Sequence, residues 1–310
     1  MSLKERNKKL FYRAIQTAVI GIAFYYIFLE IVKNWVELKN YNFSIKWSIF
    51  LLSFIPLFIY YFFLSVFWFL ISKNTIKGVN FYESVNAWFY SMLGKYIPGK
   101  IMLPLGRVYL YKDKNVSSIE VLSLFFLETL AQAGGAFFLI IVTGPLSGIS
   151  SGLKVNFYWM MGGALLLFSH PKIIEWIFNV VLRTIKSQEI KINEGYPKIL
   201  FLILLNAINL GLIGGFSFYL LISSFYCISV SKILFIAMAL GISSLSGLIA
   251  FFAPAGIGVR EGVLIYFLNF FLPPHLSVLV SIISRLWLTI CEIILISFAY
   301  ILKKQKYDII

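Results

Sequence analysis

Five basic residues stand at or inside apolar runs of this sequence, where a charged side chain is least expected. They are Lys95, Lys100, Arg107, Arg260 and Arg285. A charged group held at membrane depth is costly and is therefore a functional candidate by default. Arginine suits phosphate because its planar guanidinium donates two parallel hydrogen bonds. If these side chains converge, they predict a basic cavity that binds an anionic group.

Acidic and amide side chains occur in the same apolar runs. Glu128 lies about ten residues inside its run, and Gln132 follows one turn later on the same helical face. Arg285 and Glu292 share a face of the last run. We expect Glu128 or Glu261 to accept a hydrogen bond from Arg or Lys, because an unpaired buried carboxylate would become protonated. These groups either line the cavity or form Arg–Glu pairs that hold helices together, and the second role is favoured for Glu292.

Two segments, 94–107 and 252–262, place proline and glycine beside basic residues in apolar surroundings. The break-forming residues are Pro98 and Gly99 in the first segment and Pro254, Gly256 and Gly258 in the second. Proline and glycine at this density interrupt helices. Irregular backbone at membrane depth is tolerated only where it is buried in protein or lines a wet cavity. We therefore expect two re-entrant or broken helices, with ordinary loops as the alternative.

The two breaks are also similar to each other. Pro98 and Pro254 lie 156 residues apart, about half of the chain. In each break, proline is followed by glycine, basic residues and a new apolar segment. This spacing predicts an internal repeat of the inverted kind found in transporters.

The composition identifies the environment of these elements. Of the 310 residues 60% are hydrophobic and 13% are charged, whereas a soluble chain has roughly a quarter charged residues. The sequence therefore predicts an all-α, polytopic integral membrane protein, a single membrane domain over 1–310 with about eight transmembrane helices. The expected spans are Ala14–Leu29, Trp47–Ile71, Val121–Val142, Val155–Phe168, Ile173–Ile185, Ile199–Val230, Ile233–Val259 and Leu276–Leu302. Of these, Ile173–Ile185 is amphipathic, and its alternative is an interfacial helix.

The net charge of +14 fits the same picture. Most basic residues lie between apolar runs, as the positive-inside rule and contact with anionic lipids require, so no nucleic-acid partner is expected. Basic residues at both ends of the chain predict cytoplasmic termini in a multi-pass protein of the cell membrane. An even number of crossings follows.

The sequence lacks the residue patterns of several kinds of catalytic, metal-binding and nucleotide-binding site. The two cysteines and two histidines form no metal-binding or redox spacing, and no phosphate-binding P-loop is present. No acidic cluster suits a membrane-embedded transferase. We therefore expect no metal, no cofactor and no enzymatic activity.

The two breaks carry a family resemblance. Gly94–Lys100, followed by Pro104 and Arg107, resembles the first signature of the flippase-like membrane domain of lysylphosphatidylglycerol synthases. The segment Pro254–Glu261 resembles the second signature of that family. The order and spacing agree over nearly the whole chain. Ala255 stands where the family usually has glycine.

A second departure follows Glu128. The family often has Arg and then Asp after this glutamate, whereas this sequence has Thr129 and Gln132. Because the chain ends at Ile310 without an aminoacyl-transferase domain, lysyl transfer to lipid is not expected. Stand-alone members of the family are regarded as lipid flippases or as partners of glycosyltransferases.

The resemblance and the basic residues together predict a lipid-handling protein. Its ligand would be an anionic phospholipid or a polyprenyl-linked sugar, with the headgroup in the basic cavity and the tails in the bilayer. Arg107 and Arg260 should then face one shared cavity. The alternatives are a small-solute or ion transporter and a non-transporting partner of a membrane glycosyltransferase.

Overall fold

The computed structural model describes residues 25, 32, 44–96, 102–114, 116–146, 155–184, 189–190, 192, 194–250, 253 and 256–307, and all regular structure within them is helical. The expected span Ala14–Leu29, apart from residue 25, lies outside these ranges, as do Pro98, Gly99, Lys100 and Pro254. The all-α prediction is confirmed for the described part of the chain.

Five helical segments in the described ranges are long and apolar enough to cross a membrane. They are Trp47–Ser72 (α3, Trp47–Leu52, and α4, Phe54–Ser72), Ser118–Pro145 (within α7, Ser118–Leu146), Tyr196–Ser223 (α10, Tyr196–Ile208; η3, Asn209–Gly214; α11, Gly215–Ser223), Val230–Ile249 (η4, Val230–Lys232, and α12, Ile233–Ile249) and Pro274–Ile301 (within α14, Pro274–Tyr307). These segments are consistent with a membrane protein.

A sixth span is formed only if α8 (Val155–Phe168) and α9 (Pro171–Thr184) count together, because they meet at a bend of 68°. The bend has a local cause. Pro171 begins α9, and its ring disfavours helical backbone in the residue before it. Of the eight expected spans, Ala14–Leu29 is not covered by the described residues, and the two separate spans expected here are one bent pair. The described residues therefore show five candidate spans, or six if the bent pair counts as one.

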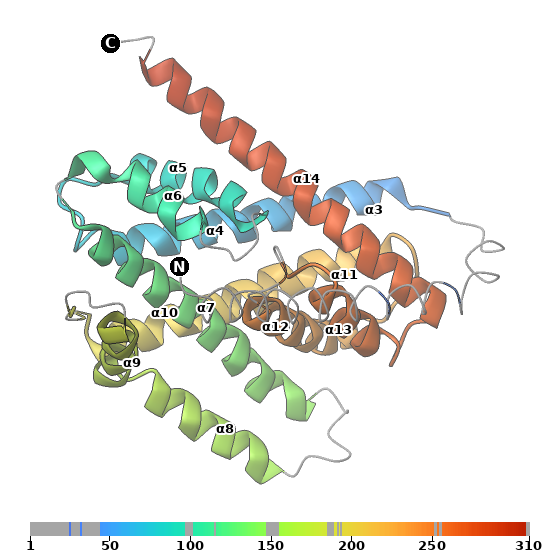
Figure 1. The fold of residues 1–310 in the computed structure, drawn as a ribbon. Helices are drawn as coiled ribbons and strands as arrows, with labels where there is room; N and C mark the ends of the chain where they lie inside the picture. The colour runs from blue at the N-terminus through green and yellow to red at the C-terminus, as the bar shows by residue number, and fades with distance from the viewer. Residues whose placement is uncertain are drawn as a thin grey trace, which may run out of the picture.

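Helix α7 packs against α4, α6 (Met102–Leu110), α8, α10 and α12, and it runs from the hairpin that contains α6 towards α8 (Figure 1). Small residues allow this close packing. A Cβ atom on Gly135 would lie 2.7 Å from Cβ of Asn206, and one on Gly134 would lie 3.0 Å from Cγ1 of Ile203. The two glycines of α7 thus allow α10 to pack close to it.

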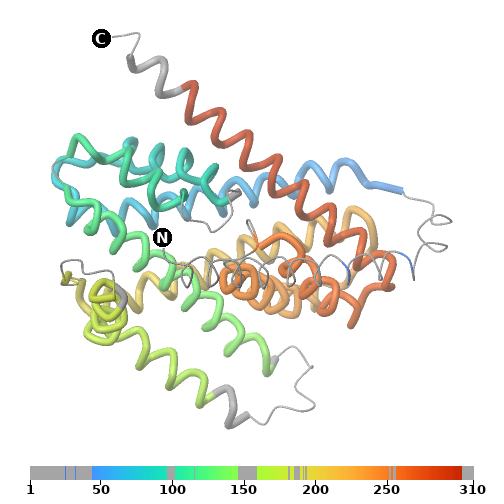
Figure 2. Tube along the Cα trace, viewed as in Figure 1, coloured from blue at the N-terminus to red at the C-terminus, as the bar shows by residue number. Residues whose placement is uncertain are grey.

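Both predicted breaks separate helices that pack side by side (Figures 1 and 2). In the first, α5 (Phe81–Ser91) and the short turn η1 (Met92–Tyr96) precede α6 (Met102–Leu110). In the second, α12 precedes α13 (Val259–Leu268). Asn80 begins α5 with a capping box, since its side chain accepts from the Glu83 backbone N–H. Whether these hairpins re-enter the membrane, and whether they form an inverted repeat, stay predictions.

Two glycines shape the turn that leads into α13. Gly256 and Gly258 have φ values of +72° and +87°, a region that side chains with a Cβ rarely adopt. A Cβ on Gly256 would also lie 2.8 Å from Cα of Gly247 on α12. The turn therefore touches α12 backbone to backbone, and this contact sets the position of Arg260 two residues beyond Gly258.

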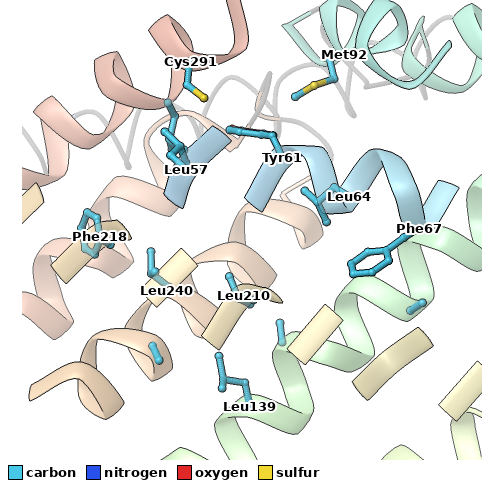
Figure 3. Close-up of a cluster of buried hydrophobic side chains, with 14 of the residues drawn as sticks. Leu57, Tyr61, Leu64, Phe67, Met92, Leu139, Leu210, Phe218, Leu240 and Cys291 are labelled. Carbon is cyan, nitrogen blue, oxygen red and sulfur yellow. The ribbon is translucent and has the colours of Figure 1, made fainter. Parts of the chain in front are cut away.

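A buried apolar cluster joins these elements (Figure 3). Leu57 and Leu64 lie on the side of α4 that faces Leu210 and Leu240, which come from η3 and α12. Tyr61, on the same helix, is also buried. The cluster thus contains a tyrosine whose hydroxyl group requires a polar partner.

Replacing Gly256 with alanine should lower the thermal unfolding midpoint of the detergent-purified protein more than Gly78→Ala does. Both glycines have positive φ, and a side chain there costs roughly 1–3 kcal/mol. Gly78, however, has open space where its Cβ would lie. Equal shifts for the two variants would show that the contact between Gly256 and Gly247 contributes nothing.

Candidate anion-binding site

Arg107 on α6 and Glu128 on α7 form a buried ion pair through Nη1 and Oε2. Their side chains are 3% and 2% exposed. The pair confirms the expectation that Glu128 accepts a hydrogen bond from a cation. It also joins α6, the helix after the first break, to α7.

Aromatic and polar neighbours surround this pair. The guanidinium of Arg107 lies 4.0 Å from the ring centroid of Trp68, and its Nε donates to Ser91 Oγ at 3.1 Å. Glu128 Oε1 accepts from Trp88 Nε1 at 2.8 Å and from Gln132 Nε2 at 3.3 Å. Because both ions are neutralised, hydrogen-bonded and shielded from solvent, this pair is a helix-packing contact.

Glu292 on α14 is a second buried carboxylate with partners from distant elements. It accepts from Lys95 Nζ of η1 at 2.5 Å and from the hydroxyl group of Tyr61 on α4. Glu292 is only 2% exposed. Its contacts therefore hold the end of the first hairpin against α4 and α14, which agrees with the structural role expected for this residue.

Glu261 ties the second break to α14. Its Oε2 accepts from the backbone N–H of Gly258 at 2.7 Å, which caps the start of α13. Its Oε1 lies 3.7 Å from Nη1 of Arg285, and its backbone oxygen accepts from Ser281 Oγ. Arg285 is thus held beside the first turn of α13, the helix that also contains Arg260.

Arg260 differs from the other three cations. Among the described residues it has no carboxylate oxygen within 4.0 Å, whereas Lys95, Arg107 and Arg285 each have one. Its side chain is half-buried and lines a cavity of about 210 Å³. The cavity lies between α4, η3, α11, α12, α13 and α14, with Tyr60 and Ser244 among its polar lining residues.

Other charged side chains lie near Arg260. Lys95 lies within electrostatic reach of Arg260, Arg285 and Glu292. Tyr60 lies within reach of Arg260 and Glu292. In the described part of the chain this cluster holds three cations and two carboxylates (Glu261 and Glu292), and so has one surplus positive charge.

A smaller cavity of about 80 Å³ adjoins the first, and Tyr60, Leu64, Leu210 and Ser244 border both. Its remaining polar lining residues are Gln132 and Asn206. Amide side chains both donate and accept hydrogen bonds. The pair of cavities thus offers a cation at one end and neutral hydrogen-bonding groups at the other.

The five predicted anion ligands divide into four groups. Arg260 lines the cavity. Lys95 lies within electrostatic reach of both Arg260 and Arg285. Arg107 is paired with Glu128 and is not among the residues that line this cavity. The expectation that Arg107 and Arg260 face one cavity is therefore corrected, because Glu128 neutralises Arg107. Lys100 lies outside the described residues.

Sequence reasoning missed the uncharged partners. Tyr60, Tyr61, Trp88 and Asn206 all lie at or beside the buried charges or cavities. Their hydroxyl, indole and amide groups in apolar runs were a signal, since buried polar groups require hydrogen bonds. Aromatic residues are so frequent in this sequence that this signal did not stand out.

Comparisons of the sequence with protein-family models and with curated proteins find no match. The geometry of the charged cluster and the sequence motifs therefore carry the functional argument.

Glu128→Gln should destabilise the protein by about 3–5 kcal/mol, because it leaves the buried charge of Arg107 uncompensated. Adding Arg107→Met should restore much of the loss, since the double variant contains neither buried ion. Thermal or denaturant unfolding in detergent measures both effects.

The control is the exposed pair formed by Arg183 and Glu189, whose side chains are 65% and 53% exposed. Glu189→Gln should change stability little, because solvent screens exposed pairs. Additive losses in the Arg107/Glu128 double variant would contradict the assignment of this pair as a coupled packing contact.

Proposed function

We propose that this protein binds an anionic lipid among its membrane helices and moves it between leaflets or presents it to a partner. The headgroup would occupy the cavity that Arg260 lines, in the region that also contains Lys95 and Arg285. The single observation that supports this proposal is an arginine without a carboxylate partner among the described residues, facing a cavity between helices apolar enough to span a membrane.

The chemistry of the cavity favours a phosphate-bearing group. A charge at membrane depth is costly unless an anion compensates it. The guanidinium of Arg260 supplies directional donors. Lys95 and Arg285 lie in the same region, each paired with a carboxylate. Among the described residues Glu292 pairs with Lys95 and Glu261 with Arg285, which leaves the single charge of Arg260 for a singly charged phosphodiester.

The location of the cavity favours a lipid over a soluble anion. Its lining residues come mainly from segments that are long and apolar enough to cross a membrane. Large apolar side chains are exposed on the same helices, such as Phe62 on α4 and Leu286 on α14. An amphipathic ligand could enter sideways from the bilayer, which a soluble ion could not do. The resemblance to the flippase-like domain supports the same ligand class.

The sequence leaves open whether the protein translocates the lipid or only holds it. A small-solute or ion transporter would use the same cation with a water-filled access path. A non-transporting partner of a glycosyltransferase would bind the lipid without moving it. Binding and translocation therefore have to be measured separately.

Arg260→Ala should weaken binding of phosphatidylglycerol by about 1–3 kcal/mol, because charge-assisted hydrogen bonds are lost. Arg260→Lys should recover part of the affinity, since lysine keeps the charge but lacks the planar guanidinium that donates two parallel hydrogen bonds. Native mass spectrometry of the protein in nanodiscs of mixed phosphatidylglycerol and phosphatidylcholine measures the bound anionic lipid.

The matched control is Lys232→Ala, which removes an exposed cation beside α12. It should leave the bound lipid unchanged. Transfer of a fluorescent phosphatidylglycerol across proteoliposomes then separates a flippase from a holding protein. If Arg260→Ala retains wild-type lipid occupancy while remaining folded, the proposed headgroup site is wrong.

A further inference from the structure

A third cavity, of about 300 Å³, lies beside the polar ones and is almost entirely apolar. Its walls come from α7, α8, α9, α10 and α12, with Leu130, Phe137, Leu165, Ile174 and Ile203 among the lining residues. Enclosed apolar cavities of about 150 Å³ stay dry and bind apolar molecules, and this space has walls of the same kind but is partly open. This larger space therefore suits a hydrocarbon occupant better than water.

The apolar cavity is joined to the polar ones at a defined place. Ala133 on α7 and Leu245 on α12 border both the apolar cavity and the small cavity that contains Gln132 and Asn206. The small cavity shares Tyr60 and other residues with the space that Arg260 lines. The three cavities thus adjoin in series, with the cation at one end and hydrocarbon walls at the other.

The side chain at position 133 is only a methyl group, so it occupies little of the space where the two cavities adjoin. Its helix runs along the apolar cavity from Leu130 to Phe137, which is about 10 Å at 1.5 Å per residue. An extended hydrocarbon segment can lie along such a wall. The order of the lining groups, from charged through neutral polar to apolar, is the order of the parts of an amphipathic lipid.

We propose that one acyl chain of the bound lipid passes between Ala133 and Leu245 and lies in the apolar cavity, rather than remaining in the surrounding bilayer. This inference rests on the proposed headgroup site at Arg260. It assigns Ala133 and Leu245 as the residues that admit the chain, and it predicts that occupation of the apolar cavity depends on the headgroup.

Photo-crosslinking tests this arrangement directly. Nanodiscs would contain phosphatidylglycerol with a diazirine at the end of one acyl chain, or phosphatidylcholine with the same labelled chain. Peptide mapping then compares labelling of the cavity residues Phe137, Leu165 and Ile174 with labelling of Trp159 and Met160, which are exposed on α8. We expect the phosphatidylglycerol probe to label the cavity residues and both probes to label Trp159 and Met160.

Ala133→Phe should lower labelling of the cavity residues by about tenfold, because the ring closes the junction. Val142→Phe is the matched control, since it adds a ring at an exposed position of the same helix that borders none of these cavities. It should leave the labelling unchanged. Binding of water-soluble dihexanoyl phosphatidylglycerol should be the same for Ala133→Phe and the unmodified protein.

Equal cavity labelling by the two probes, or undiminished labelling in Ala133→Phe, would overturn the chain assignment and identify the occupant as ordinary bilayer lipid. If Ala133→Phe fails to fold or loses the short-chain lipid, the chain assignment is tested by comparing the two probes on the unmodified protein. Failure of the headgroup site is seen separately: Arg260→Ala would then bind dihexanoyl phosphatidylglycerol normally.

Discussion

Every carboxylate buried among these helices needs a cation, because a buried carboxylate without one is costly or takes up a proton. The structure meets this constraint with partners from other elements, so that each ion pair also joins segments distant in the sequence. The pairs are Arg107–Glu128, Lys95–Glu292 and Arg285–Glu261. The first holds α6 to α7, the second holds η1 to α14, and the third holds α13 to α14. Both helix hairpins are thereby fastened to the rest of the bundle.

This pairing accounts for three of the four described cations near the breaks and leaves Arg260 to face a cavity. Its position follows from backbone geometry: the positive φ values of Gly256 and Gly258 turn the chain sharply, and Gly247 allows the turn to lie against α12. The break in the helix is therefore coupled to the site. Its glycines bring a cation to a cavity between helices, where a continuous helix would direct the same side chain elsewhere.

The apolar runs predicted most elements within a few residues, since long uncharged segments have few alternatives to a helix at membrane depth. The segments 155–168 and 173–185 were expected as two spans, and the structure joins them in one pair bent by 68° at Pro171. Proline indicated an interruption there, but the angle across it depends on packing against neighbours. Likewise, the spacing of Glu128 and Gln132 predicted their shared helical face, which their hydrogen bond confirms.

The sequence by itself determined that this is a helical protein with apolar segments able to span a membrane, interrupted near the two motifs. It also indicated that the charges in these apolar segments either pair with each other or form a site. These properties follow from local composition and from the period of a helix. Only the tertiary structure decided which charges meet. Arg107 and Arg260 are equivalent in type and in their place after a break, yet one packs against Glu128 and the other lines a cavity. The reason is that ion pairing depends on distances between helices, and helix packing sets those distances.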